Sequence, residues 1–229
     1  NGPLTATYTI TPVGSNPANC PGLPVTTTVT VNPKPAVANQ TALVCSNATA
    51  GLTLGNDPDG PAAATYNITN INPNGLTTSA GSPATGTGFD AAVIADDAWT
   101  NTGTAPVNVV YTVTPLSADG CAGAPFTVTI TILPAPAGNA LPATQILCSN
   151  AAINPIVLTT NNNLYGTTFS WTRDNTLNVT GLANSGNGAI SGTPRNLGAA
   201  NEVVNYTITP TSAAGCAGAP FSALLTVKP

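Results

Sequence analysis

The stretch Tyr111-Thr112-Val113-Thr114-Pro115 decides the fold, because closely similar segments stand at 8–12 and 206–210. Each segment is followed by a cysteine, and a proline stands thirteen residues after each cysteine. The three cysteines are Cys20, Cys121 and Cys216. They are 101 and 95 residues apart, which is the length of a small domain rather than of a short solenoid repeat. The sequence therefore predicts a tandem array of domains.

These motifs divide the chain into three parts. Residues 34–134 and 135–229 are each expected to form a complete repeat, and residues 1–33 the C-terminal part of a truncated repeat. Pro33-Lys34-Pro35 and Pro134-Ala135-Pro136 stand at the boundaries. Because proline fixes φ and disfavours helix, these linkers are expected to be short and semi-rigid. We therefore expect the domains to be strung out as a rod.

Apolar and polar residues alternate in several segments, most clearly at 106–114, 125–133, 201–209 and 220–228. Alternation with period two, together with many β-branched residues, predicts strands that bury one face. About seven such strands fit in each repeat, and no segment has a convincing helical pattern. The predicted fold class is all-β, with tandem immunoglobulin-like antiparallel β-sandwiches.

The first 33 residues contain two of these strands. Leu4, Ala6, Tyr8 and Ile10 give the hairpin an apolar face. Since two strands alone are marginally stable in water, we expect this face to need cover from the earlier part of the same repeat or from another chain.

Charged side chains are rare, with 4 Lys+Arg, 8 Asp+Glu and no His in 229 residues. Clustered Lys and Arg for a nucleic acid or an anionic membrane surface are missing, and no apolar run is long enough to cross a membrane. A nucleophile–histidine pair is excluded, and the few carboxylates suggest no glycosidase pair. We therefore expect that the protein is not an enzyme and binds no nucleic acid.

Each complete repeat has an early cysteine in a Cys-Ser-Asn-Ala segment and a late cysteine after the Tyr-Thr-x-Thr-Pro motif. We predict the disulfides Cys45–Cys121 and Cys148–Cys216, with Cys20 paired outside this sequence. Metal binding is the alternative, but neither Cys-x-x-Cys nor His accompanies the cysteines. Paired disulfides indicate an oxidising compartment.

Two weaker candidate ligand sites remain. Asp57, Asp59, Asp96 and Asp97 are the clustered acids, and the segment 56–60 resembles the start of a calcium loop. Pro58 and the lack of a downstream Glu favour a plain turn over a calcium loop. We therefore expect no cofactor, with calcium as the alternative. Trp99 stands beside two of these acids, as the ring of an exposed sugar platform does, and is the weak candidate for ligand binding. A half-buried anchor of its loop is the interpretation that we favour.

The repeated Tyr-Thr-Val-Thr-Pro motif, the segment Gly-Cys-Ala-Gly-Ala-Pro-Phe at 120–126 and 215–221, and the early Cys-Ser-Asn resemble the PKD-like, immunoglobulin-like repeats of very large bacterial surface adhesins. The chain is most similar to adhesins of gliding Gram-negative bacteria, which are exported by type IX secretion. The resemblance implies an extracellular stalk or filament on the cell surface that holds a distal adhesive region away from the cell.

Partners implied in this way are the neighbouring repeats, other copies in filaments, and a surface glycan or substratum. The alternative function is a carbohydrate-binding accessory module of a secreted hydrolase. An exposed row of aromatic residues on one sheet would favour that alternative, whereas a surface of Thr, Asn and Ser would favour the stalk.

Overall fold

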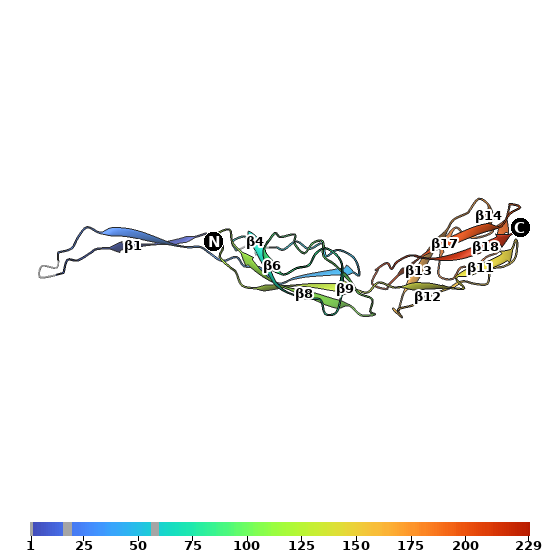
Figure 1. Cartoon of the computed structure of the whole chain (residues 1–229), viewed down its shortest axis with the longest axis horizontal. Coiled ribbons are helices and arrows are strands. Elements are labelled where there is room, and N and C mark those ends of the chain that lie inside the picture. The colour runs from blue at the N-terminus through green and yellow to red at the C-terminus, as the bar shows by residue number, and fades with distance from the viewer. Residues whose placement is uncertain (1, 16–19, 56–59) are drawn as a thin grey trace.

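The computed structural model describes residues 2–15, 20–55 and 60–229, and its regular elements there are all β-strands. A hairpin and two domains follow one another along the long axis of the molecule (Figure 1). We call the unit from β3 to β9, residues 40–133, the first domain, and the unit from β10 to β18, residues 138–228, the second domain.

The first domain has a five-stranded sheet in the order β3-β9-β8-β4-β6. Its strands are β3 (Gln40–Cys45), β9 (Phe126–Leu133), β8 (Val107–Leu116), β4 (Thr65–Asn72) and β6 (Gly86–Phe89). A second sheet pairs β5 (Thr77–Ala80) with β7 (Ala98–Thr100). The edge strand β3 runs parallel to β9, and the other pairs are antiparallel.

The second domain repeats this arrangement in its main sheet, which has the order β11-β18-β17-β13-β15. Its strands are β11 (Thr144–Cys148), β18 (Phe221–Lys228), β17 (Glu202–Thr211), β13 (Thr168–Arg173) and β15 (Ser185–Asn187). Two small sheets pair β10 (Gly138–Leu141) with β12 (Val157–Thr160), and β14 (Val179–Thr180) with β16 (Arg195–Asn196). Here too the first strand of the main sheet, β11, is parallel to the last, β18. The tandem β-sandwich prediction is confirmed, with one parallel pair in each main sheet.

The core of each domain lies against the central hairpin of its main sheet. Tyr111 on β8 pairs with Val128 on β9, and both side chains are fully buried. The alternate residues on these strands are half-buried, as the alternation in the sequence predicts. Tyr206 on β17 has the same buried position opposite Ala223 on β18.

The first hairpin consists of β1 (Leu4–Ile10) and β2 (Val25–Val31) and has the same register as these central hairpins. Unlike them, it has no second sheet or loop of the described chain packed on its apolar face, and all residues of its two strands are exposed. Leu4 pairs with Val31 and Ile10 with Val25, which places these apolar side chains on one face. Leu4 is 76 % exposed and Ile10 57 % exposed. The sequence correctly predicts this apolar face, and it is uncovered.

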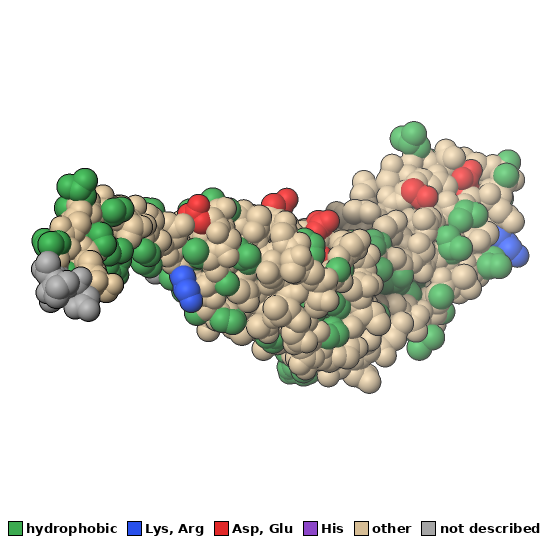
Figure 2. Space-filling view, turned by 60° about the vertical axis from the view of Figure 1, so that its left-hand side comes forward, with side chains coloured by type: hydrophobic (Ala, Val, Ile, Leu, Met, Phe, Trp, Pro, Cys, Tyr) green, Lys and Arg blue, Asp and Glu red, His purple; other side chains and the backbone are tan. Residues whose placement is uncertain are grey.

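Little charge is visible on the surface. The face shown in Figure 2 is mostly backbone and uncharged polar side chains, with isolated acidic and basic groups and apolar side chains gathered on the hairpin. In the ranges that the structure describes, there is no helix with the length and apolar character needed to cross a membrane.

Candidate functional site at the domain junction

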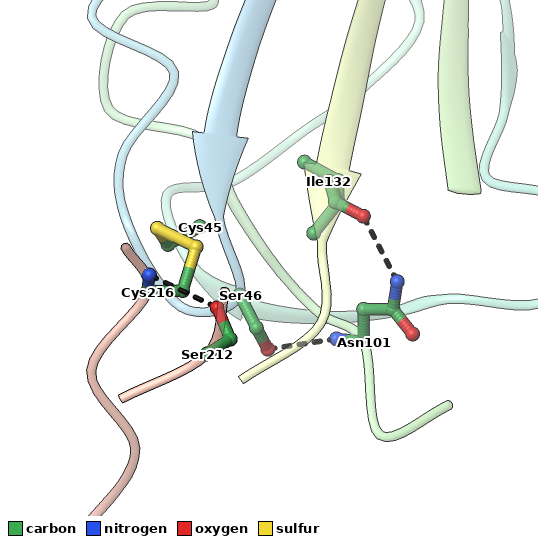
Figure 3. Close-up of a disulfide and its surroundings, with 6 residues drawn as sticks. All are labelled: Cys45, Ser46, Asn101, Ile132, Ser212 and Cys216. Atoms are coloured by element: carbon green, nitrogen blue, oxygen red, sulfur yellow. Dashed lines mark hydrogen bonds between the residues drawn. A yellow bond between two sulfur atoms is a disulfide. The ribbon is translucent and has the colours of Figure 1, made fainter. Parts of the chain in front are cut away.

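A disulfide joins the two domains. Cys45, at the end of β3, is bonded to Cys216, in the turn between β17 and β18, with a Cα–Cα distance of 5.5 Å (Figure 3). Cys121 and Cys148 are free thiols, and so is Cys20. The predicted pairs Cys45–Cys121 and Cys148–Cys216 are therefore wrong.

The direction of the edge strand explains the correction. Because β3 is parallel to β9, Cys45 lies beside Leu133, the last residue of β9. Cys121 stands before β9 begins, so the two cysteines of the first domain are separated by about the 25 Å length of that strand. A disulfide requires Cα atoms within about 7 Å. Cys121 therefore cannot reach Cys45, whereas the Cα atom of Cys216 in the next domain lies 5.5 Å away.

The late cysteine is held by a compact turn. The Cys216 amide donates to the Ser212 hydroxyl oxygen at 3.1 Å (Figure 3). The Ser212 amide donates in return to the Cys216 carbonyl oxygen at 2.9 Å. Gly215 precedes the cysteine with φ +84°, a conformation that residues with a Cβ rarely adopt. These contacts hold the buried Cys216 toward the first domain.

The early cysteine is held by the end of its own sheet. The Asn101 amide donates to the Ser46 hydroxyl oxygen at 2.8 Å, and the Asn101 side-chain amide donates to the Ile132 carbonyl oxygen at 2.9 Å (Figure 3). The Ser46 amide donates to the Leu133 carbonyl oxygen at 2.8 Å. Asn101 is not among the residues predicted from the sequence, although an Asn-x-Gly segment stands at 101–103 and again at 196–198.

The linker is fixed to the second domain. The Asn162 side-chain amide donates to the Ala135 carbonyl oxygen at 3.0 Å, and its oxygen accepts from the Ala137 amide at 3.2 Å. Gly218 lies directly against the Pro136 carbonyl oxygen, so that an added Cβ would collide with it. The linker therefore has little freedom to bend away from the second domain.

Two hollows lie along the junction. One of about 170 Å³ is lined by apolar residues of both domains, among them Leu133, Pro134, Leu164 and Ala214, with Tyr165 at its rim and 97 % exposed. The other, of about 310 Å³, adjoins Ser46 and Asn162. These hollows leave the contact between the domains incompletely packed, and the disulfide and the linker both cross it.

The structure removes Trp99 from the candidate ligand-binding residues. Its strand β7 pairs with β5 over the core of the first domain, and the side chain is 4 % exposed. The indole nitrogen donates to the Tyr111 hydroxyl oxygen at 3.2 Å, and that hydroxyl donates to Asp97 Oδ2 at 2.7 Å. The prediction of a sugar platform is wrong because the ring is used in packing. Trp171, the other tryptophan, packs in the core of the second domain.

The acidic candidates do not converge in the part of the chain that the structure describes. Asp97 is buried while its neighbour Asp96 is exposed, and no group of three or more potential metal ligands is found among the described residues. Burial raises the pKa of Asp97 to about 6, and the hydrogen bond from Tyr111 partly opposes that rise. Asp57 and Asp59 lie outside the described residues, so the calcium prediction for that segment stays a prediction.

The PKD-like domain family matches residues 42–136 and 145–229. The chain belongs to this family. The two matched segments correspond to the two domains described above, so the PKD-like chain has two such domains in tandem, linked by a disulfide.

Several solved structures with repeated extracellular or fibronectin-type modules are similar to this PKD-like chain. Protocadherin gamma C5 EC1–3 is 13 % identical over 98 % of this chain and 77 % of that one, with a TM-score of 0.34. The fibronectin(III)-like modules of Clostridium thermocellum CbhA are 13 % identical over 84 % of this chain and 90 % of that one, with a TM-score of 0.31. Drosophila N-cadherin EC1–4 is 15 % identical over 99 % and 58 %, with a TM-score of 0.29. These low scores carry no argument about function, and no curated protein matches the chain.

Proposed function

We propose that this PKD-like chain is a load-bearing section of an extracellular stalk in a large bacterial surface adhesin. The stalk holds a distal adhesive region away from the cell and serves adhesion or gliding motility. The observation that carries the proposal is the Cys45–Cys216 bond, which links one domain covalently to the next. Export by type IX secretion is proposed from the sequence resemblance described above.

The position of the bond suits a chain that is pulled at its ends. Force that enters at the N-terminus reaches Cys45, crosses the disulfide to Cys216 and leaves along β18. Residues 46–215 lie inside the closed loop and cannot be extended while the bond is intact. A disulfide within one domain would leave the linker as the only covalent connection between the domains.

The surface also favours a stalk over a carbohydrate-binding module. Tyr8 and Tyr165 are the aromatic side chains that are largely exposed, and they belong to the hairpin and to the junction respectively. The other nine aromatic residues are buried or packed against the two cores. No sheet in the described part of the chain therefore presents the aromatic row that the alternative function needs.

The chemistry of the chain fits a mechanical role without catalysis. There is no His in the sequence, and the described carboxylates form no cluster with other potential ligands. An interdomain disulfide also requires an oxidising environment, which supports placing the protein outside the cell. Partners proposed on this basis are neighbouring repeats, further copies in filaments, and a surface glycan or substratum at a distal region.

Solution scattering on the full chain tests the proposal. A compact protein of 229 residues would have a radius of gyration of about 17 Å. A rod of hairpin and two domains should give a clearly larger value under oxidising conditions and should keep it at high salt. A value near that of a sphere would contradict the stalk, and specific binding on a glycan array would then favour the carbohydrate-binding alternative.

A further inference from the structure

The surroundings of Cys45 are duplicated around Cys148. Cys45 ends β3 opposite Leu133, and Cys148 ends β11 opposite Lys228. The following serine, Ser149, donates its amide to the Lys228 carbonyl oxygen at 2.9 Å, as Ser46 does to Leu133. The end of the second domain therefore presents a cysteine in the same local geometry as the bonded one.

The side chains that fix this geometry are duplicated as well. The Asn196 amide donates to the Ser149 hydroxyl oxygen at 3.1 Å, and the Asn196 side chain donates to the Val227 carbonyl oxygen at 2.9 Å. Asn196 is buried, as Asn101 is in the first domain. The difference is that Cys148 is exposed and unpaired.

The late cysteine of the first domain, Cys121, lies in the counterpart of the turn that holds Cys216. The Cys121 amide donates to the Ser117 hydroxyl oxygen at 3.1 Å, and the Ser117 amide donates to the Cys121 carbonyl oxygen at 3.0 Å. Gly123 lies against the Pro35 carbonyl oxygen as Gly218 lies against that of Pro136. Cys45 forms its disulfide with a cysteine in a turn of this kind, which the second domain supplies.

We propose that Cys148 and the end of the second domain around it form a docking site for another PKD-like domain of the same kind as residues 34–134. Its late-cysteine turn would bond to Cys148 as the turn of Cys216 bonds to Cys45. The inference concerns the junction itself and does not depend on where such a stalk is displayed.

Charge complementarity favours an occupant of the first-domain type. At the observed junction, Leu133 and Ala214 line the same hollow. The counterpart of Leu133 in the second domain is Lys228, since each is the residue opposite the early cysteine. The counterpart of Ala214 in the first domain is Asp119, since each lies two residues before the late cysteine. Stacking a first-domain turn on the end of the second domain therefore brings the opposite charges of Lys228 and Asp119 to the same hollow.

Bond formation is a two-electron oxidation. The Cys148 thiol and the late-cysteine thiol each lose a proton, their sulfurs join, and two electrons pass to a disulfide oxidant such as oxidised glutathione, which becomes two thiols. The exposure of Cys148 gives such an oxidant access to it.

A string of domains joined in this way would extend very little under load. The force crosses one interdomain bond and arrives at a late cysteine. It then follows the backbone to the next early cysteine, where it crosses the next interdomain bond. In this chain that path is residues 121–148, which hold β9, the linker, β10 and β11. The remainder of each domain lies outside the loaded path.

The test is an extended chain in which a second copy of residues 34–134 follows Pro229 directly. The extended chain is folded with a mixture of reduced and oxidised glutathione and mapped by non-reducing peptide mass spectrometry. We expect two interdomain bonds, Cys45–Cys216 and a bond between Cys148 and Cys121 of the added copy. The same chain with Cys148→Ser should keep the first bond and leave the added copy's Cys121 as a thiol.

Recovery of Cys148 as a free thiol while Cys45–Cys216 has formed would overturn the proposal, and so would a bond from Cys148 to any other cysteine. The Cys45–Cys216 bond reports folding of the two original domains. Protease resistance of the added copy, measured on the same sample, shows that this copy has folded as well, so that a misfolded copy is not mistaken for a negative result. The stalk proposal is tested separately by the solution scattering of the unextended chain.

Discussion

Cys45 ends the first strand of the first domain, and its sulfur is bonded to Cys216, 171 positions later in the second domain. The bond closes a loop that includes most of both cores and the linker between them, while β18 of the second core lies after the loop. The two domains therefore act as one covalent unit along the axis of the molecule.

This relationship predicts a large change in extensibility when the bond is removed. Pulling the oxidised chain from its two ends should extend only the residues outside 46–215. The double variant Cys45→Ser, Cys216→Ser should release in addition on the order of 600 Å of contour length, because an extended residue spans at most about 3.6 Å. Single-molecule force spectroscopy measures both lengths.

Cys20→Ser serves as the control, because this exposed thiol lies on the hairpin outside the loop. It should leave the force-extension trace of the oxidised chain unchanged. Equal contour lengths for the oxidised chain and the double variant would contradict the covalent path.

The strands were predictable from the sequence because alternation is a local signal. Phe126, Val128 and Ile130 fall on one face of a strand whatever that strand pairs with, and all three are buried. The disulfide map depends on the direction of the edge strand β3, which no local pattern encodes. A parallel edge strand places the early cysteine at the opposite end of the domain from the late one.

The error at Trp99 has a similar origin. Two neighbouring acids and a loop-like sequence are compatible with an exposed ring, but β7 pairs with β5 and buries it. The acceptor for its indole N–H is Tyr111, twelve residues away on another strand. Long-range partners of this kind follow from topology, so they have no local signature in the sequence.

The contact between Gly218 and Pro136 predicts that Gly218→Ala will destabilise the junction. The added Cβ would collide with the Pro136 carbonyl oxygen, which is a backbone atom and cannot rotate away. We expect a loss of about 1–3 kcal/mol in the stability of the second domain and slower formation of the Cys45–Cys216 bond. Denaturant unfolding and timed thiol trapping measure the two effects.

Gly14→Ala is the matched control, because its added Cβ would make only ordinary contact with the Cys20 carbonyl oxygen. It should change neither quantity. If Gly218→Ala behaved like this control, the glycine would not be needed for close approach of the linker.

Asp97 predicts a pH dependence of stability in the first domain. Its pKa is raised by burial from 3.8 to about 6 in the folded state, so the folded protein binds a proton more tightly than the unfolded chain does. The stabilisation from this proton is complete below about pH 4 and is lost as the pH rises through about 6. Asp97→Asn should therefore raise the stability at pH 7 by about 1–3 kcal/mol and flatten the profile between pH 4 and 6.

Urea unfolding at a series of pH values measures this profile. The asparagine side chain of the Asp97→Asn variant keeps an oxygen that can accept the hydrogen bond of Tyr111. Asp119→Asn is the control, because Asp119 is an exposed acid in the turn after β8, away from Asp97, and it should leave the profile in place. The predicted sign would be contradicted if the parent protein became more stable between pH 4 and pH 7 and the Asp97→Asn variant did not.

The two isoleucines of the repeated Tyr-Thr-Ile-Thr-Pro motif should respond very differently to the same truncation. Ile208 is fully buried in the second core, whereas Ile10 is 57 % exposed on the uncovered hairpin. Ile208→Ala should cost about 2–5 kcal/mol, because it removes buried methyl groups and leaves a cavity. Ile10→Ala should change the free energy of unfolding of the two domains by no more than about 0.5 kcal/mol, as is usual for an exposed site.

Denaturant unfolding of the two variants, each compared with the parent chain, measures both changes. A large loss for Ile10→Ala would mean that the hairpin face is covered in solution, by a second copy or by the domain that follows it, and concentration-dependent unfolding would distinguish these two covers.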